Sequence, residues 1–301
     1  KKKQPNELRF AFIGDSITYG HGVKDQDRFS NIFELNLTQA CAEHLISTIN
    51  TGVPGYSIKH EYQDLLSISH LQPDVVFLQF TLNDLTEPFN FEKRLGGSGI
   101  DYHRVADTSF WHFYLSQRSA LYLLANDLSK QIRFGTKNDT DIQQKAIAAE
   151  IMHSTELINH PNDARQEKYW EEYLFWFDKF IQQCNKTNTA CILVMSPYTF
   201  QLSLPLENAY PQKRLEEHAR SKGMTVINLL PVFQEIIQKE IAVRYNLEPN
   251  TPIEHLYEVY RVEFNEIIQR YFLDHDHYAP QGHAVVANTL MDATSYMCSN
   301  N

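Results

Sequence analysis

The chain has 301 residues, 43% of them hydrophobic, and its formal net charge is −10. This length suits an α/β domain with insertions, and the hydrophobic content excludes wholesale disorder. An acidic chain lacks the basic surface that non-specific nucleic-acid binding requires, so we expect no nucleic-acid partner.

The ends and cysteines of the chain bear on where it works. No apolar run approaches the roughly 18 residues of a membrane span, and no signal-peptide pattern is present. The chain starts at Lys1 without methionine, so we expect that a preceding segment has been removed, and this favours a secreted or periplasmic location over a cytoplasmic one. Four cysteines without a CxxC pair argue against zinc and redox motifs. Cys184 and Cys191 are close enough to close a small loop, and the sequence leaves reduced thiols and disulfides equally open.

Short apolar runs bounded by turn residues predict five buried strands. In chain order these are residues 8–13, 46–49, 74–80, 190–195 and 224–229. Helical spacing or end signals predict helices at 29–45, 57–71, 109–132, 165–183, 207–222 and 280–297. Strands that alternate with helices indicate βαβ units and a parallel sheet, with both faces covered.

Two stretches interrupt this alternation. Residues 85–189 and 238–271 lack convincing core strands and are mostly helical. We therefore predict a single domain over residues 1–301, with a mostly helical insertion at 85–189 and a second one at 238–271.

Polar residues follow the first three strands, at the edge of a parallel sheet where ligands bind. Ser16 follows Gly14 and precedes a helix, so it is either a nucleophile or an ordinary N-cap. Gly52 and Gly55 follow the second strand, where exposed backbone amides would either stabilise an oxyanion or form a simple turn. Asn83 follows the third strand and could donate to an oxyanion or form a turn.

A cluster of aspartates and histidines precedes the last helix. Asp274 and His277 are three residues apart, which suits a carboxylate that orients a general base. If this segment is extended, His275 points away from Asp274, and His283 falls within the helix where packing is the commoner role. The cluster could also bind a metal, but no standard ligand spacing such as HExxH occurs.

Four segments, taken in this order, resemble the SGNH (GDSL) hydrolase family. The matching residues are Gly14, Asp15 and Ser16, then Asn50, Gly52 and Gly55, then Asn83 and Asp84, and last Asp274 and His277. The resemblance covers about residues 8–84, 190–233 and 272–298. One position departs from the family pattern, because Thr81 stands where the family usually has glycine.

The resemblance implies a fold, an activity and roles for residues. The fold is a flavodoxin-like three-layer αβα sandwich with a five-stranded parallel sheet of order 2-1-3-4-5. The activity is serine-dependent ester hydrolysis or acyl transfer without cofactor or metal, with Ser16 as nucleophile, His277 as base and Asp274 orienting it. The backbone amides of Ser16 and Gly55 and the side chain of Asn83 would form the oxyanion hole.

The substrate is predicted less sharply than the chemistry. Family members deacetylate carbohydrates, cleave lipid esters or thioesters, or transfer acyl groups between polysaccharides, and we expect a small-molecule or glycan ester. The predicted insertion is rich in aromatic residues, which either stack on sugars or belong to the core. These are Phe110, Trp111, Phe113, Tyr114, Tyr169, Trp170, Tyr173, Phe175, Trp176 and Phe177. We favour a carbohydrate O-acetylesterase, with an O-acyltransferase, a lipase or thioesterase, or a non-catalytic carbohydrate-binding protein as alternatives.

Overall fold

The computed structural model describes residues 2–86 and 139–298, and it divides the chain into two compact units. The larger unit comprises Lys1–Leu85 and Glu156–Asn301, and the smaller one comprises Thr86–Thr155. Helix α8 (Asp139–Asn159) contains the described part of the smaller unit, apart from Thr86. The helix predicted at 109–132 lies outside the described residues.

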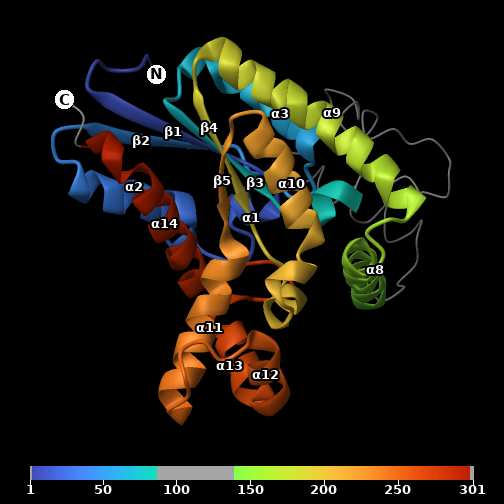
Figure 1. Cartoon of the computed structure of the whole chain (residues 1–301). Coiled ribbons are helices and arrows are strands. Elements are labelled where there is room, and N and C mark those ends of the chain that lie inside the picture. Colours follow the sequence, from blue (N-terminus) through green and yellow to red (C-terminus); the bar gives the residue numbers. More distant parts are fainter. Residues whose placement is uncertain (1, 87–138, 299–301) are drawn as a thin grey trace. The chain divides into compact units, whose positions relative to one another are not determined.

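A five-stranded parallel sheet forms the centre of the larger unit (Figure 1). Its strands are β1 (Glu7–Ile13), β2 (Leu45–Asn50), β3 (Val75–Phe80), β4 (Ala190–Met195) and β5 (Thr225–Asn228). They lie in the order β2-β1-β3-β4-β5, and every pair of neighbours is parallel. The predicted fold class and strand order are therefore confirmed.

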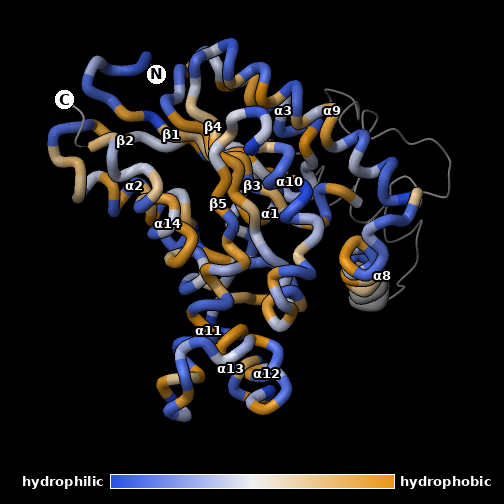
Figure 2. The backbone as a smooth tube through the Cα atoms, viewed as in Figure 1, coloured by the Kyte–Doolittle hydropathy of each residue, from blue (hydrophilic) through white to orange (hydrophobic). Residues whose placement is uncertain are grey.

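Alternate residues of the central strands enter two separate cores. Phe10 and Phe12 of β1 point into one core, whereas Ala11 and Ile13 point into the other. Because both faces of the sheet centre are buried, β3 and β4 are mainly apolar. Figure 2 shows hydrophobic colour on the central strands, whereas hydrophobic and hydrophilic colours alternate along the helices.

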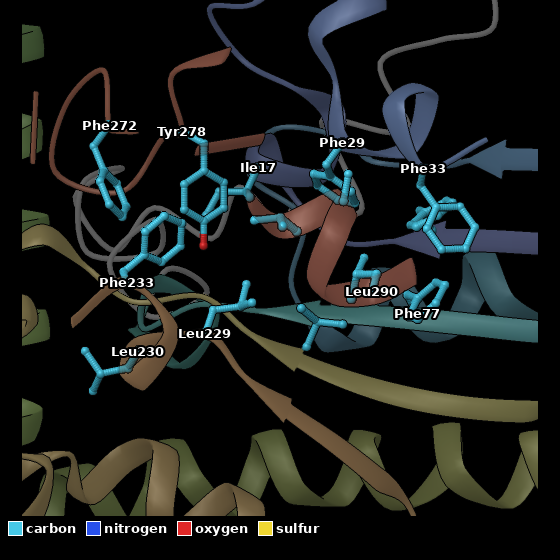
Figure 3. Packing of buried hydrophobic residues seen from close by; sticks show 14 of the residues in the cluster. Ile17, Phe29, Phe33, Phe77, Leu229, Leu230, Phe233, Phe272, Tyr278 and Leu290 are labelled. Atoms are coloured by element: carbon cyan, nitrogen blue, oxygen red, sulfur yellow. The ribbon is translucent and has the colours of Figure 1, made fainter. Parts of the chain in front are cut away.

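Helices cover both faces of the sheet and complete three layers (Figure 1). On one face lie α2 (Phe29–Ala40), α11 (Leu229–Tyr245) and α14 (Pro280–Thr294), and on the other α3 (Ile58–Ile68), α9 (Ala164–Thr187) and α10 (Tyr210–Ser221). Figure 3 shows the first core at close range, where Leu290 of α14 and Phe33 of α2 lie beside Phe77 of β3. The rings of Phe33 and Phe77 meet edge to face, with centroids 5.6 Å apart.

The two regions predicted as insertions contain helices that differ in their packing. Helix α9 packs against α3 and β4, and its Trp170, Tyr173 and Phe177 are buried in the core. The second region contains part of α11, α12 (Ile253–Val259) and α13 (Arg261–Tyr271), which pack on one another beyond the sheet (Figure 1). The division into one domain with two insertions stays a prediction.

Two disulfides connect elements of the larger unit. Cys184–Cys191 closes the turn between α9 and β4, and Cys41–Cys298 joins the end of α2 to the segment after α14. The sequence left reduced thiols and disulfides equally open, and the structure contains disulfides. Across the described residues, no helix combines the length and the apolar character that a membrane crossing demands.

Candidate active site

Ser16 lies where β1 ends and the short helix α1 (Ser16–Tyr19) begins. The side chain of Asp15 caps this helix by accepting a hydrogen bond of 2.9 Å from the Ile17 amide. A Cβ atom on Gly14 would lie 2.3 Å from Oγ1 of Thr18 and 3.0 Å from Cβ of Gln79, so any larger residue would displace these side chains. These contacts place Ser16 at the carboxyl edge of the sheet, where α/β proteins bind ligands.

The loop after β2 packs directly on α1. The side-chain amide of Asn50 donates to the carbonyl of Thr18 at 2.7 Å, and its oxygen accepts from the Gly52 amide at 2.9 Å. A Cβ atom on Gly52 would lie 2.2 Å from the backbone nitrogen of Tyr19, so this close approach requires glycine. Gly55 follows with φ of +81°, a left-handed conformation that glycine adopts without strain.

The segment after β3 is tied to the nucleophile turn. Nδ2 of Asn83 donates to Oδ2 of Asp15 at 3.3 Å, and the Thr81 amide donates to Asp84 at 2.8 Å. Asn83 is therefore placed next to the residue that precedes Ser16. The predicted oxyanion hole of Ser16, Gly55 and Asn83 stays a prediction.

The segment between α13 and α14 bends back on itself. The Asp276 and His277 amides both donate to Oδ1 of Asp274, at 3.1 and 2.9 Å. A bridge between Phe272 and Tyr278 closes the bend. The segment is thus a bend rather than an extended chain. The prediction that His275 points away from Asp274 assumed an extended segment, so it loses its basis.

The fold brings the three predicted catalytic side chains into one hydrogen-bonded line. Nε2 of His277 lies 2.9 Å from Oγ of Ser16, although the residues are 261 apart in sequence. Nδ1 of the same ring lies 2.8 Å from Oδ2 of Asp274. This is the geometry that allows an imidazole to take a proton from a hydroxyl while a carboxylate holds its other nitrogen. The catalytic roles themselves remain predictions.

Charges within the site favour a protonated imidazole. Burial acts to lower the pKa of His277, but hydrogen bonds to Asp274 and Asp276 outweigh it and hold this pKa above its ordinary value. Burial acts to raise the pKa of Asp274, yet the hydrogen bonds from His277 and the backbone keep it well below its usual range. For Asp15, burial and the nearby Asp276 raise the pKa to about 6.

The other two histidines of the cluster have different surroundings. Nδ1 of His283 accepts a hydrogen bond from the Phe29 amide at 3.3 Å, and burial lowers the pKa of this ring to about 3. His275 meets the ring of Tyr198 edge to face, with centroids 5.4 Å apart. Neither has a hydrogen bond to Ser16 in the described structure.

Two side chains at the site had no assigned role in the sequence reasoning. Oδ1 of Asp276 lies 3.0 Å from Nδ1 of His277, and the His21 ring lies 4.7 Å from the His277 ring, centroid to centroid. In the sequence, only the alternation of aspartate and histidine from Asp274 to His277 indicates that Asp276 belongs to the site. This alternation does not predict which carboxylates face the base.

Asp274, Asp276 and His277 each offer an oxygen or nitrogen within 4.8 Å of the others. A metal there would require Nδ1 as a ligand. That nitrogen faces two carboxylate acceptors, so we assign a proton to it, and a protonated nitrogen does not bind a metal. The residues thus fit a hydrogen-bonded set better than a cation site, and metal-free chemistry stays a prediction.

Several solved structures share this fold at low sequence identity. A gut microbial diltiazem-metabolizing enzyme is 14% identical with a TM-score of 0.51, and the match covers 98% of this chain and 48% of that one. An α/β hydrolase enzyme from the metagenome of Lake Arreo, Spain, is 13% identical with a TM-score of 0.50, covering 98% and 97%. An acetyl xylan esterase is 16% identical with a TM-score of 0.45, covering 95% and 99%. The chain thus spans about half the length of the first of these.

Sequence comparison gives the family directly. No curated protein matches the chain. The model of the family described as GDSL-like lipase/acylhydrolase matches residues 10–290, which include Ser16 at one end and Asp274 and His277 at the other. This match spans nearly the whole chain and both parts of the site, and the chain therefore belongs to the GDSL-like lipase/acylhydrolase family.

Proposed function

We propose that this protein is a carboxylic ester hydrolase that works through an acyl-enzyme on Ser16. The observation that carries the proposal is the contact between Oγ of Ser16 and Nε2 of His277 at 2.9 Å, with Asp274 on the opposite nitrogen. Membership of a lipase and acylhydrolase family supports it.

In the proposed reaction, Oγ of Ser16 attacks the ester carbonyl and its proton passes to Nε2 of His277. The tetrahedral intermediate collapses when His277 returns that proton to the leaving alcohol, which leaves an acyl group on Ser16. Water then gives a proton to His277 and attacks the acyl carbon. Collapse of the second intermediate releases the carboxylic acid and restores the Ser16 hydroxyl.

The oxyanion of each intermediate needs hydrogen-bond donors. In the proposal these are the backbone amides of Ser16 and Gly55 and the side chain of Asn83. The contacts of the loops support this assignment, because Gly52 packs on α1 and Asn83 hydrogen-bonds Asp15, so both loops lie against the nucleophile turn. One such donor typically contributes about 3 kcal/mol to transition-state stabilisation.

For the substrate we propose acetyl esters of carbohydrates. Half-exposed rings next to the predicted site residues support this choice, since Tyr19 is 47% exposed and Tyr56 directly follows Gly55. Aromatic faces of this kind can stack on sugars. The buried Trp170, Tyr173 and Phe177 are core residues and give no such support, and Phe110, Trp111, Phe113 and Tyr114 lie outside the described residues.

A series of aryl esters from acetyl to decanoyl, together with acetylated glycans, tests the proposal. We expect the highest kcat/KM for acetyl esters and acetate release from glycans, with neither in Ser16→Ala. A preference for decanoyl esters would indicate a lipase or thioesterase. Acetate release that becomes acetyl transfer when an acceptor glycan is added would indicate an O-acyltransferase. No turnover of any ester would contradict the proposal as a whole.

A further inference from the structure

We infer that Asp276 is a second positioning carboxylate for His277, which holds the imidazole jointly with Asp274. This inference rests on the proposed function, because it assigns Asp276 to the reaction in which His277 accepts the serine proton. The residues of this segment that carry the resemblance to the family are Asp274 and His277, and Asp276 is not among them.

Both carboxylates face the same nitrogen. Nδ1 of His277 hydrogen-bonds Oδ2 of Asp274 at 2.8 Å, and it makes an ion-pair contact of 3.0 Å with Oδ1 of Asp276. The bend produces this convergence, because Asp274 accepts the Asp276 and His277 amides and so turns the chain around its own carboxylate. The ring is thereby held from two sides while its Nε2 faces Ser16.

The two carboxylates differ strongly in exposure. The side chain of Asp274 is 43% exposed, whereas that of Asp276 is 2% exposed. A buried charge acts through a lower effective dielectric constant and is less screened by salt. At equal distance, Asp276 should therefore attract the imidazolium more strongly than Asp274 does. A buried carboxylate also needs a positive partner to offset its desolvation, and the imidazolium formed during catalysis is such a partner.

Other titratable groups surround this pair and belong to several elements. Nε2 of His275 lies 3.4 Å from Oδ1 of Asp276, and Asp15 at the start of α1 repels Asp276 electrostatically. The His21 ring lies tilted against the His277 ring, and His283 of α14 interacts with His277 electrostatically. Burial raises the pKa of the Tyr278 hydroxyl, and the charge of the nearby Asp276 raises it further. None of these five groups is a carboxylate in contact with Nδ1, so the role falls to Asp276.

The experiment uses three test variants, namely Asp276→Asn, Asp274→Asn and the double variant Asp274→Asn/Asp276→Asn. Asp292→Asn is the control variant. The control removes the same charge from an exposed position on α14. Each variant is assayed for kcat and KM across pH with a short aryl ester, and circular dichroism checks the fold. In parallel, NMR follows the titration of the His277 ring.

We expect Asp276→Asn to lower kcat by about 10- to 100-fold with KM nearly unchanged, because Asp274 still holds the ring. The double variant should lose about 10,000-fold, the loss typical when a catalytic histidine has no carboxylate. The acid side of the pH profile should move to lower pH by about one unit in Asp276→Asn, since one carboxylate fewer favours the imidazolium less. Asp292→Asn should match the wild type.

A second variant keeps the inference testable if Asp276→Asn does not fold. In Asp274→Asn, which alters a half-exposed side chain, Asp276 should keep the His277 pKa above its ordinary value. A fall to the ordinary value or below would overturn the inference, as would an Asp276→Asn enzyme with the kcat and pH profile of Asp292→Asn. If the wild type hydrolyses no ester, the proposed function fails, and the NMR titration still decides whether Asp276 acts on His277.

Discussion

The Ser16 hydroxyl and the imidazole of His277 lie in hydrogen-bond contact, with 2.9 Å between Oγ and Nε2, and in the proposed mechanism they act as one proton-transfer unit. Residues that act as a unit have non-additive effects when they are removed. We therefore expect Ser16→Ala and His277→Ala each to lower kcat for an acetyl aryl ester at least about 1,000-fold, and the double variant to be little worse than either. Steady-state kinetics on the three proteins measures this. Turnover of Ser16→Ala within tenfold of the wild type would remove Ser16 from the mechanism.

The neighbouring histidines provide matched controls for His277. His275 contacts Asp276, and His283 accepts a hydrogen bond from the Phe29 amide, so each supports the site without facing Ser16. We expect His275→Ala and His283→Ala to retain activity within about tenfold when circular dichroism shows a native fold. A loss as large as that of His277→Ala in either folded variant would show that the base is assigned to the wrong residue.

The carboxylates around His277 also set a direction for pH dependence. They hold its pKa above the ordinary value, so the imidazolium persists to higher pH. Because the base must be neutral to accept the serine proton, kcat/KM should rise with pH, with the midpoint of its acid limb above about 6.5. A pH–rate profile in buffers of constant ionic strength measures that midpoint. A midpoint below 6 would contradict the raised pKa.

At the scale of elements, the site depends on the close approach of the β2–α3 loop to α1. A Cβ atom on Gly52 would lie 2.2 Å from the Tyr19 nitrogen and 2.5 Å from the Thr18 carbonyl carbon, so Gly52→Ala must displace the helix that begins with Ser16. We expect it to lower thermal stability and to reduce kcat at least about tenfold. Gly223→Ala is the control, because Gly223 has φ of +78° and no atom within 4 Å of the added Cβ. It should cost about 1 kcal/mol of stability through backbone strain and leave kcat unchanged. Equal effects of both variants on kcat would contradict the argument.

Strands were easier to predict than the helices around them. The strand predicted at 190–195 coincides with β4, because a short apolar run between a turn and Ser196-Pro197 has few other interpretations. The helix predicted at 29–45 extends too far, since it ends at Ala40 and Leu45 already begins β2. Apolar residues continue across that boundary, and periodicity alone does not mark it. Helix α11 starts directly after β5, and only its second half fell within the predicted insertion at 238–271.

At the scale of the whole molecule, the two disulfides close loops of very different length. Cys41–Cys298 spans 257 residues and Cys184–Cys191 spans 7. Loop-closure entropy predicts that removing the first costs about 5 kcal/mol of folding free energy and removing the second about 2 kcal/mol. Urea unfolding of Cys41→Ser/Cys298→Ser and Cys184→Ser/Cys191→Ser compares them. A larger loss from the short loop would show that local packing outweighs chain entropy here.

The site was predictable as far as it follows the ends of strands. Ser16 and Asn83 follow strands, and parallel strands bring their carboxyl ends to one edge of the sheet. His277 follows no strand, and its predicted place in the site came from the resemblance to the SGNH (GDSL) family. The second carboxylate was not predictable in the same way. Asp276 reaches His277 only because Asp274 accepts two backbone amides and bends the chain, and that bend replaces the extended segment assumed from the sequence.

The separation of 261 positions between Ser16 and His277 has a consequence for the protein during its synthesis. A ribosome adds roughly 5–20 residues per second, so the serine emerges on the order of 10 to 50 s before the histidine that activates it. Throughout that interval the hydroxyl has no general base and remains a weak nucleophile. If Ser16 is the nucleophile, the nascent chain carries an inert serine during that interval, and the proposed hydrolysis can begin only once the bend before α14 has docked against α1.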